Sequence, residues 1–328
     1  MQKFNRDLFY PIQKISLSKF INLHKNEIIS SSILNDFIIN NISSDNDNFE
    51  NSLIFLKNDK FKIINKITRK NILIITDVPE YYEQLKSKKS TLLVSSINSI
   101  YRLFLDTIFI SDDHKNFEDN YNLINGSYIS IDSKIDKSAK LYPGCIIGKG
   151  CQIGKNTIIK QNCSIKYSII GDNTIINENT TLGSTGFGFP TNAGSNSLYP
   201  HLGYVYIGNN CSIGSNCTVD RGKIDITLIN DNCMLDNLIH VGHNVCINKN
   251  TTIAAQTGIS GSVKIGDNVT IGGQVGFAGH LTIGENVIIA AKSGVTKNIK
   301  DNSVVAGFPA IDMKEWKKNV IKQRKNGH

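Results

Sequence analysis

Two histidines and a carboxylate lie close together in the segment DNLIHVGHN at residues 236–244. Asp236 precedes His243 by seven residues, and His240 precedes it by three. A histidine titrates near neutral pH and can accept a proton from an attacking nucleophile. A carboxylate can hold the histidine ring and stabilise its protonated form. The segment therefore contains the parts of a general base centred on His243.

Two residues farther along the chain complete the chemistry of acyl transfer. These residues are Gly261 and His280. A glycine leaves its backbone N–H open to an approaching oxyanion. No motif pairs a serine or cysteine nucleophile with these residues, so we expect direct attack by the acceptor and no covalent enzyme intermediate.

The histidines also fit a second interpretation, which is a zinc site like that of the γ-class carbonic anhydrases. His240 and His243 lie on opposite sides of Val241, which is expected to point inward. Joint ligation of one ion by this pair is therefore the weaker hypothesis.

A six-residue repeat must position these residues. An aliphatic or aromatic residue recurs every six positions through residues 229–295. Earlier series cover residues 129–182, with a slip of one residue after position 165, and residues 207–219. Neither the 3.6-residue period of a helix nor the alternation of a simple strand gives this spacing. The repeat predicts a parallel β-helix in which each hexad contributes one inward residue.

A corner signal gives the size of one coil. The signal recurs once in every three hexads, as Asn230-Asp231-Asn232, Asn248-Lys249-Asn250, Gly266-Asp267-Asn268 and Gly284-Glu285-Asn286. Gly and Asn tolerate the left-handed backbone of a tight corner. One coil is therefore three hexads, and successive coils are stacked at roughly 4.8 Å.

The size of the coil places the candidate residues relative to one another. Gly261 follows His243 by three hexads, and His280 follows Gly261 by three hexads and one residue. Residues one coil apart lie above one another in a solenoid. We therefore expect His243, Gly261 and His280 to share one column within about 10 Å.

The remaining segments lack the hexad and read differently. We expect residues 1–122 to form a separate α/β domain. The polar residues 111–128 are expected to link it to the β-helix. In that domain we expect a short helix capped by Ser16, buried strands at 71–78 and 91–94, and a helix over 97–108. A Gly/Pro/Asn-rich stretch at 183–203 must leave the coil as a loop, a common place for function. The β-helix is assigned to residues 123–308, and a basic helical tail to 309–328.

The bulk composition indicates an ordinary soluble protein. Apolar residues make up 40% of the chain and charged residues 20%, with a net charge of +8. No arginine-rich or aromatic-interleaved basic stretch suggests nucleic acid. The N-terminus lacks a run typical of a signal peptide, so we expect a cytoplasmic protein without a membrane span. All seven cysteines fall in the repeat region, where we expect them to be packed and unpaired.

The chain closely resembles the UDP-3-O-acylglucosamine N-acyltransferases, hexapeptide-repeat enzymes of bacterial lipid A biosynthesis. Six motifs carry the resemblance: GSTGFGF (183–189), YPHLG (199–203), TVDRGKIDIT (218–227), DNLIHVGHN (236–244), ISGS (259–262) and FAGH (277–280). It implies a left-handed β-helix and a homotrimer with active sites between neighbouring subunits. It also implies that His243 is the general base, Asp236 its supporting acid, Gly261 the oxyanion amide and His280 the second histidine.

The resemblance extends to substrates and partners. The family's uridine motif, F-x-x-N-x-x-Y, matches Phe55, Asn58 and Phe61, where Phe61 lacks the tyrosine hydroxyl. Phe55 would stack on uracil and Asn58 would hydrogen-bond its edge. The acyl donor would be acyl carrier protein with its phosphopantetheine arm, and no other cofactor is implied. Lys297 and the basic tail are expected to meet this acidic carrier.

Two rival functions stay open. His240 stands where the family often has glutamine, and the resulting His-x-x-His pair is similar to UDP-N-acetylglucosamine O-acyltransferase. That enzyme lacks an N-terminal domain, which argues against it. We group His240 with the expected substrate-binding residues Phe55, Asn58 and Phe61. The second rival is a non-catalytic β-helix that binds a nucleotide-sugar.

Overall fold

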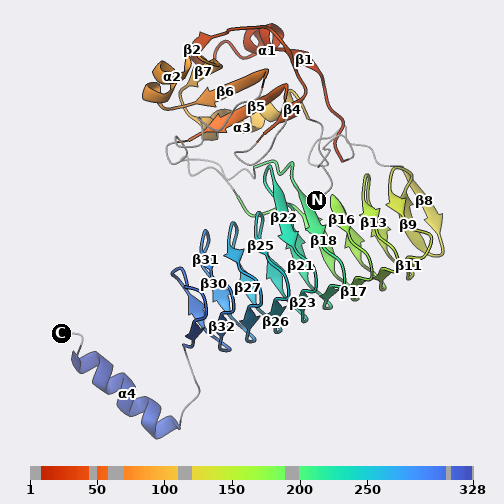
Figure 1. Cartoon of the computed structure of the whole chain (residues 1–328), viewed down its shortest axis with the longest axis vertical. Coiled ribbons are helices and arrows are strands. Elements are labelled where there is room, and N and C mark those ends of the chain that lie inside the picture. The colour runs from red at the N-terminus through yellow and green to blue at the C-terminus, as the bar shows by residue number, and fades with distance from the viewer. Residues whose placement is uncertain are drawn as a thin grey trace.

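The computed structural model describes residues 9–43, 50–57, 70–109, 120–188, 199–307 and 312–326. Most of these residues form a parallel β-helix with three flat faces, as predicted (Figure 1). The first face contains β10 (Lys134–Ile135), β13 (Gln152–Ile153), β16 (Ser168–Ile170), β19 (Tyr204–Ile207), β22 (Ile226–Ile229), β25 (Cys246–Ile247), β28 (Lys264–Ile265) and β31 (Thr282–Ile283).

The second face contains β11 (Lys140–Leu141), β14 (Ile158–Ile159), β17 (Ile175–Ile176), β20 (Ser212–Ile213), β23 (Met234–Leu235), β26 (Thr252–Ile253), β29 (Thr270–Ile271), β32 (Ile288–Ile289) and β34 (Val304–Val305). The third face contains β8 (Tyr121–Ile124), β9 (Ser127–Ser130), β12 (Ile146–Ile147), β15 (Ser164–Ile165), β18 (Thr181–Ser184), β21 (Thr218–Asp220), β24 (His240–Val241), β27 (Gly258–Ile259), β30 (Gly276–Phe277) and β33 (Gly294–Val295). Along the regular coils the chain visits the first, second and third faces in that order.

The strand register follows the coil of three hexads. His240 pairs with Gly258, and Thr252 pairs with Thr270, each exactly one coil later in the chain. The predicted slip is also present, because Gln152 pairs with Ile169, one residue short of a full coil. The hexad residues are buried and form one continuous apolar core through the coils.

Asparagines hold one corner of the β-helix together. Asn232, Asn250, Asn268, Asn286 and Asn302 all have a left-handed backbone, with φ between 55° and 60°. The side-chain amide of each of the first four donates to the Oδ1 of the next asparagine at 3.0–3.2 Å. The corner signal read from the sequence therefore marks a backbone conformation that asparagine tolerates at low cost.

The corner between the third and first faces carries two excursions. The first leaves after β18 and returns at β19, so that Ile169 pairs with Tyr206 over about twice the length of a regular coil. The second lies between β21 and β22, where the pairing of Tyr206 with Leu228 encloses four residues more than a regular coil. His243 lies at the same corner one coil later, between β24 and β25. Both excursions therefore emerge close to His243.

The first strands of the third face correct one prediction. The sequence predicts a linker over residues 111–128, of which residues 111–119 lie outside the described residues. In the rest of that range β8 and β9 form an antiparallel hairpin that begins this face. Asn125 and Gly126 turn the hairpin with φ of 49° and 78°. An Asn-Gly pair is the preferred turn for such a hairpin. The assigned boundary at residue 122 falls inside β8, and both domain boundaries stay predictions.

The N-terminal domain is the α/β unit that the sequence predicts. Its sheet has the order β2 (Ile28–Ser32), β7 (Ser90–Val94), β6 (Ile72–Thr76), β5 (Ser52–Leu56) and β4 (Asn41–Ile42), beside a pair of β1 (Ile15–Ser16) and β3 (Ile38–Ile39). The helices are α1 (Leu17–Leu23), α2 (Pro79–Leu85) and α3 (Ile97–Asp106). The Ser16 hydroxyl accepts from the Lys19 N–H, which confirms the predicted cap.

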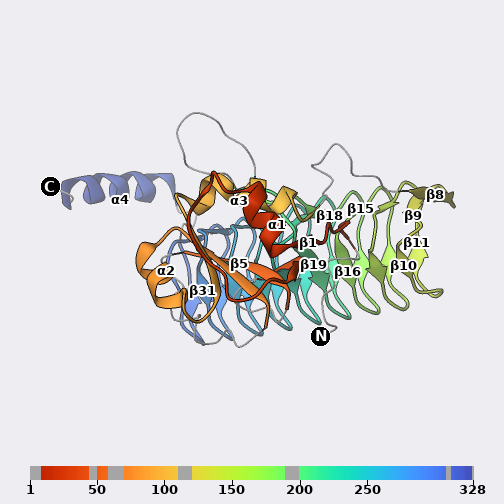
Figure 2. The same cartoon turned by 90° about the horizontal axis from the view of Figure 1, so that it is seen from above.

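Aromatic side chains join this domain to the β-helix. The ring of Tyr10 stacks on that of Tyr167 at 4.9 Å, and Phe9 stacks on Tyr204 at 6.1 Å. Phe9, Tyr10, Tyr167 and Tyr204 are buried in one apolar cluster shared by both units. Figure 2 shows the domain lying over the coils between β19 and β31. It therefore sits near the corner that carries the two excursions.

The remaining features agree with the composition. All seven cysteines are free, and all except the half-buried Cys246 are buried. The C-terminal helix α4 (Met313–Asn326) stands away from the last coil (Figure 1). Within the described ranges no helix has the length and apolar character needed to cross a membrane.

Candidate active site

The ring of His243 is held between two glycines from different parts of the chain. A Cβ added to Gly261 would lie 2.8 Å from Nε2 and 2.9 Å from Cε1 of His243. A Cβ added to Gly186, in the first excursion, would lie 2.7 Å from the His243 Cβ and 3.0 Å from its Cδ2. The half-buried ring therefore fits only because neither neighbour has a side chain. This geometry bears out the expected stacking of Gly261 on His243.

Asn244 fixes which nitrogen of His243 is basic. Its Oδ1 lies 3.0 Å from His243 Nδ1 and accepts the backbone N–H of Lys223 at 2.9 Å. Because Lys223 donates to this atom, the atom is an acceptor, and His243 Nδ1 must carry the hydrogen. In the neutral ring Nε2 therefore carries the lone pair, and it faces Gly261. The arrangement prepares Nε2 to accept a proton.

Within one chain, Asp236 lies away from the His243 ring, and its supporting role stays a prediction. Asp236 follows β23, at the corner between the second and third faces, whereas His243 follows β24 at the next corner. The Oδ1 of Asp236 accepts the neighbouring Asn237 N–H at 2.7 Å. Seven residues in a coil of three hexads carry the chain around one corner, so Asp236 and His243 lie at different corners of the β-helix.

His280 also lies one position away from the expected column. Ser262 N donates to His243 O, and His280 N donates to Gly261 O at 3.1 Å. Asn244, Ser262 and His280 share the left-handed corner conformation, with φ of 60°, 64° and 63°. His280 therefore continues the column of Asn244 and not that of His243, and its exposed ring lies beside the site.

The backbone N–H of Gly261 is available for an oxyanion. No acceptor among the described residues bonds this N–H, although the neighbouring Ser262 N–H is bonded to His243 O. An open N–H next to a basic imidazole nitrogen is the arrangement that stabilises a tetrahedral oxyanion.

A buried carboxylate meets His240 on the third face. Asp220 is 5% exposed and accepts the Ser184 hydroxyl at 2.7 Å. Its Oδ2 lies 3.6 Å from His240 Nε2. Burial raises the pKa of Asp220, and the nearby Ser184 hydroxyl and histidines oppose this shift. Asp220 therefore provides a buried partner for the exposed His240 ring.

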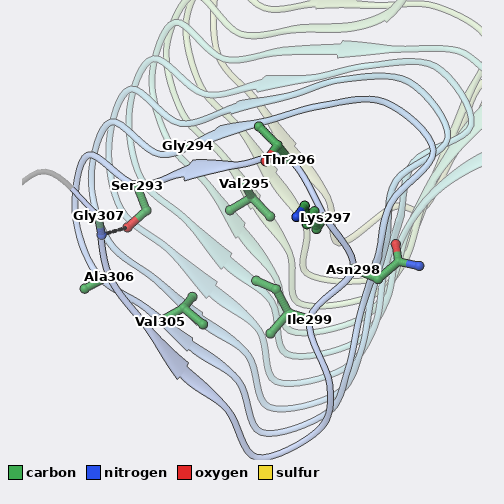
Figure 3. Close-up of a pocket in the computed structure, with 10 residues that line it drawn as sticks. All are labelled: Ser293, Gly294, Val295, Thr296, Lys297, Asn298, Ile299, Val305, Ala306 and Gly307. Carbon is green, nitrogen blue, oxygen red and sulfur yellow. Dashed lines mark hydrogen bonds between the residues drawn. The ribbon is translucent and has the colours of Figure 1, made fainter. Parts of the chain in front are cut away.

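A row of glycines continues from His240 along the outer surface of the third face. Gly258, Gly276 and Gly294 follow His240 in register, one per coil. A Cβ on any of these three would meet nothing within 4 Å. A separate pocket of about 220 Å³ lies at the open end of the last coil, where the inward side chains Val295, Ile299 and Val305 line it together with Gly294 and Lys297 (Figure 3). The surface beside the histidines is therefore open along three coils.

The proposed uridine motif is only partly described. Phe55 lies on β5, is half-buried, and packs on Tyr101 with ring centroids 4.9 Å apart. Tyr101 in turn meets Tyr199 of the first excursion at 5.3 Å. Asn58 and Phe61 lie outside the described residues. Phe55 therefore stands in an aromatic cluster between the two units, and its binding role stays a prediction.

Several residues of the site were not identified from the sequence. Asn244 directly follows His243, and this neighbouring position is the sequence feature that could have identified it. Asp220 and His201 lie within quoted motifs, TVDRG and YPHLG, but had no spacing that linked them to His243. Gly186 lay in the predicted loop.

Known proteins are similar to this chain in sequence and in fold. Residues 262–297 match the family model described as bacterial transferase hexapeptide (six repeats). UDP-3-O-acylglucosamine N-acyltransferase 2 of Legionella pneumophila (strain Lens) is 52% identical over 139 residues, which are 42% of this chain and 40% of the relative. UDP-3-O-acylglucosamine N-acyltransferase of Rickettsia akari is 49% identical over 140 residues, which are 43% of this chain and 40% of the relative. These matches span about two fifths of the length of the curated relatives.

Solved structures share the β-helix. The UDP-N-acetylglucosamine acyltransferase of Francisella novicida has a TM-score of 0.52 and 25% identity, covering 60% of this chain and 72% of that chain. LpxA of Acinetobacter baumannii has a TM-score of 0.52 and 22% identity, covering 60% and 78%. The second similarity shows the fold alone.

Proposed function

We propose that this protein is an N-acyltransferase of lipid A biosynthesis. It moves a (3-hydroxy)acyl chain from acyl carrier protein to the 2-amine of UDP-3-O-acylglucosamine. One observation carries the proposal. His243 Nδ1 is bonded to Asn244, which leaves Nε2 as the nitrogen that faces Gly261, in a chain 52% identical over 139 residues to an enzyme with that name.

The reaction follows from these two groups. His243 Nε2 accepts a proton from the sugar amine while the nitrogen attacks the thioester carbonyl carbon. A C–N bond forms, and the carbonyl oxygen becomes an oxyanion that accepts the Gly261 N–H. The intermediate collapses by breaking the C–S bond, and the His243 imidazolium returns the proton to the leaving sulfur. Asn244 keeps the ring in the required tautomer throughout.

The glycine row supplies a place for the acyl chain. Gly258, Gly276 and Gly294 leave the third face without side chains for three coils beyond His240. An extended acyl chain can lie on such a surface and be covered there by a neighbouring subunit of the proposed homotrimer. Lys297, at the end of the row, is exposed and suits a contact with the acidic acyl carrier protein.

The second candidate is O-acylation of UDP-N-acetylglucosamine. The His240-x-x-His243 pair and the similarity to the Francisella novicida structure favour it. The N-terminal domain, with Phe55 at its contact with the β-helix, favours the first proposal.

An acceptor comparison tests the proposal. Purified protein receives 3-hydroxyacyl carrier proteins of several chain lengths with either the free-amine sugar or UDP-N-acetylglucosamine, and products are identified by mass spectrometry. We expect N-acylation of the free amine and its loss in His243→Ala, with retained binding of the UDP-sugar. A matched control is His24→Ala, a buried histidine of the N-terminal domain. Preference for the N-acetyl sugar would overturn the assignment, and full turnover by His243→Ala would overturn the mechanism.

A further inference from the structure

A second histidine, His201, lies beside the general base and takes no part in the proposed reaction. Its side chain is fully buried, in the chain that returns from the first excursion. Nδ1 lies 2.9 Å from the carbonyl oxygen of Tyr199, so Nδ1 carries the hydrogen and Nε2 has a bare lone pair. Within the described parts of the chain, Nε2 has no hydrogen-bond partner. Desolvation lowers the pKa of His201 to about 3, so the ring is neutral at any working pH.

The ring of His201 packs directly on that of His243. Their centroids are 5.3 Å apart, in an edge-to-face arrangement at 66°. Gly186 packs against both, because a Cβ there would lie 2.8 Å from His201 Nε2 and 2.7 Å from His243 Cβ. His201 and Gly186 therefore both pack directly against the His243 side chain.

The backbone of His201 is tied to the N-terminal domain. Its carbonyl oxygen accepts the Tyr10 hydroxyl at 3.2 Å and Arg221 Nε at 3.0 Å. Arg221 is 1% exposed and lies over the ring of Tyr167, on which Tyr10 stacks. Tyr199, which orients the His201 ring, meets Tyr101 of the N-terminal domain. Two separate contacts thus connect the docked domain to His201.

We propose that His201 is a positioning residue through which the docked N-terminal domain holds the ring of His243 against Gly261. The inference rests on the proposed function, since it assigns a partner to the general base. A neutral ring suits this place, because a second cation would repel the imidazolium that forms in the reaction. His201 Nε2 carries a lone pair and no charge, so it does not oppose the charge that His243 gains during the reaction.

Two substitutions separate positioning from simple packing. His201→Phe keeps a ring of similar shape but loses the hydrogen bond to Tyr199. Tyr10→Phe removes only a hydroxyl, at the far end of the connection, and keeps the stacking on Tyr167. The matched control is His24→Gln, because His24 is also buried and also has a pKa lowered by desolvation, but it bonds Thr107 within the N-terminal domain.

The experiment measures kcat, KM for both substrates, the melting temperature, and the His243 Cε1–H resonance in histidine-labelled full-length protein. We expect kcat to fall about 10- to 100-fold in His201→Phe and several-fold in Tyr10→Phe, with both KM values nearly unchanged, because small misplacements of a reacting group are costly. The His243 resonance should shift in both variants and stay in place in His24→Gln.

Unchanged kcat and an unchanged His243 resonance in His201→Phe would overturn the inference. Equal loss of kcat in the His24→Gln control would also overturn it, since destabilisation alone would then explain the effect. An inactive wild type would instead refute the proposed function, and the resonance would still report whether His201 positions His243.

Discussion

Replacing Gly261 by alanine tests the geometry of the site with one methyl group. The added Cβ would lie 2.8 Å from His243 Nε2, 2.9 Å from Cε1 and 3.2 Å from Cδ2. Unstrained contacts between such atoms begin at about 3.5 Å, so the ring must retreat by roughly 0.7 Å. The backbone of Gly261 is in a conformation open to any L residue, so the substitution adds no strain of its own.

The expected consequence is a defect in the chemical step. A displacement approaching 1 Å costs on the order of 100-fold in rate, or about 2.7 kcal/mol in the activation free energy. We expect kcat of Gly261→Ala to fall by about 10- to 100-fold, while both KM values and the melting temperature change little. The assay follows N-acylated sugar by mass spectrometry at saturating carrier protein.

Gly279→Ala is the matched control. Gly279 occupies the same corner one coil later, and its added Cβ would meet its nearest neighbour, Gly261 O, at an ordinary 3.4 Å. We expect its kcat to stay within about twofold of the wild type, because contacts at this distance need no displacement. Wild-type kcat in Gly261→Ala, or equal losses in both variants, would refute the geometric argument.

Three other substitutions test the groups around His243. Asn244→Ala removes the acceptor that holds His243 Nδ1–H, so kcat should fall by about 100-fold. Asn244→Asp keeps an acceptor and should retain most activity. Equal losses of kcat in both variants would contradict this role of Asn244. Asp220→Asn keeps a partner for Ser184 but removes the charge beside His240. KM for the UDP-sugar should therefore rise several-fold while kcat stays nearly constant. An unchanged KM would refute a role of His240 in substrate binding. Burial lowers the pKa of His201 from 6.5 to about 3, so the unfolded chain binds an additional proton between these values and stability is lost as the pH falls below about 6.5. At about pH 4.5 this loss reaches roughly 2–3 kcal/mol. It should be absent in His201→Gln, as measured by urea unfolding of both proteins at about pH 7.5 and about pH 4.5.

The hexad pattern alone predicts the β-helix, the coil of three hexads and the stacking of Gly261 on His243. These features repeat along the chain, and each follows from local residue preferences, with aliphatic residues inside and asparagine at left-handed corners. Counting residues is sufficient where the coils are regular. The sequence also predicts the N-terminal α/β domain, because apolar runs mark its buried strands and Ser16 marks the start of its first helix.

The groups that surround His243 become apparent only in the folded chain. The coils before it pair irregularly, through one short coil and two long excursions, so counting does not place His201 or Asp220 at its corner. Asn244 bonds the His243 ring and Asp236 does not, and His280 lies one position away from the His243 column. Both facts depend on the side of a corner that each backbone position faces. Side chains at neighbouring positions of a corner diverge, so a shift of one residue changes what each can touch. The chemistry therefore lies in contacts between coils and domains, which no local pattern encodes.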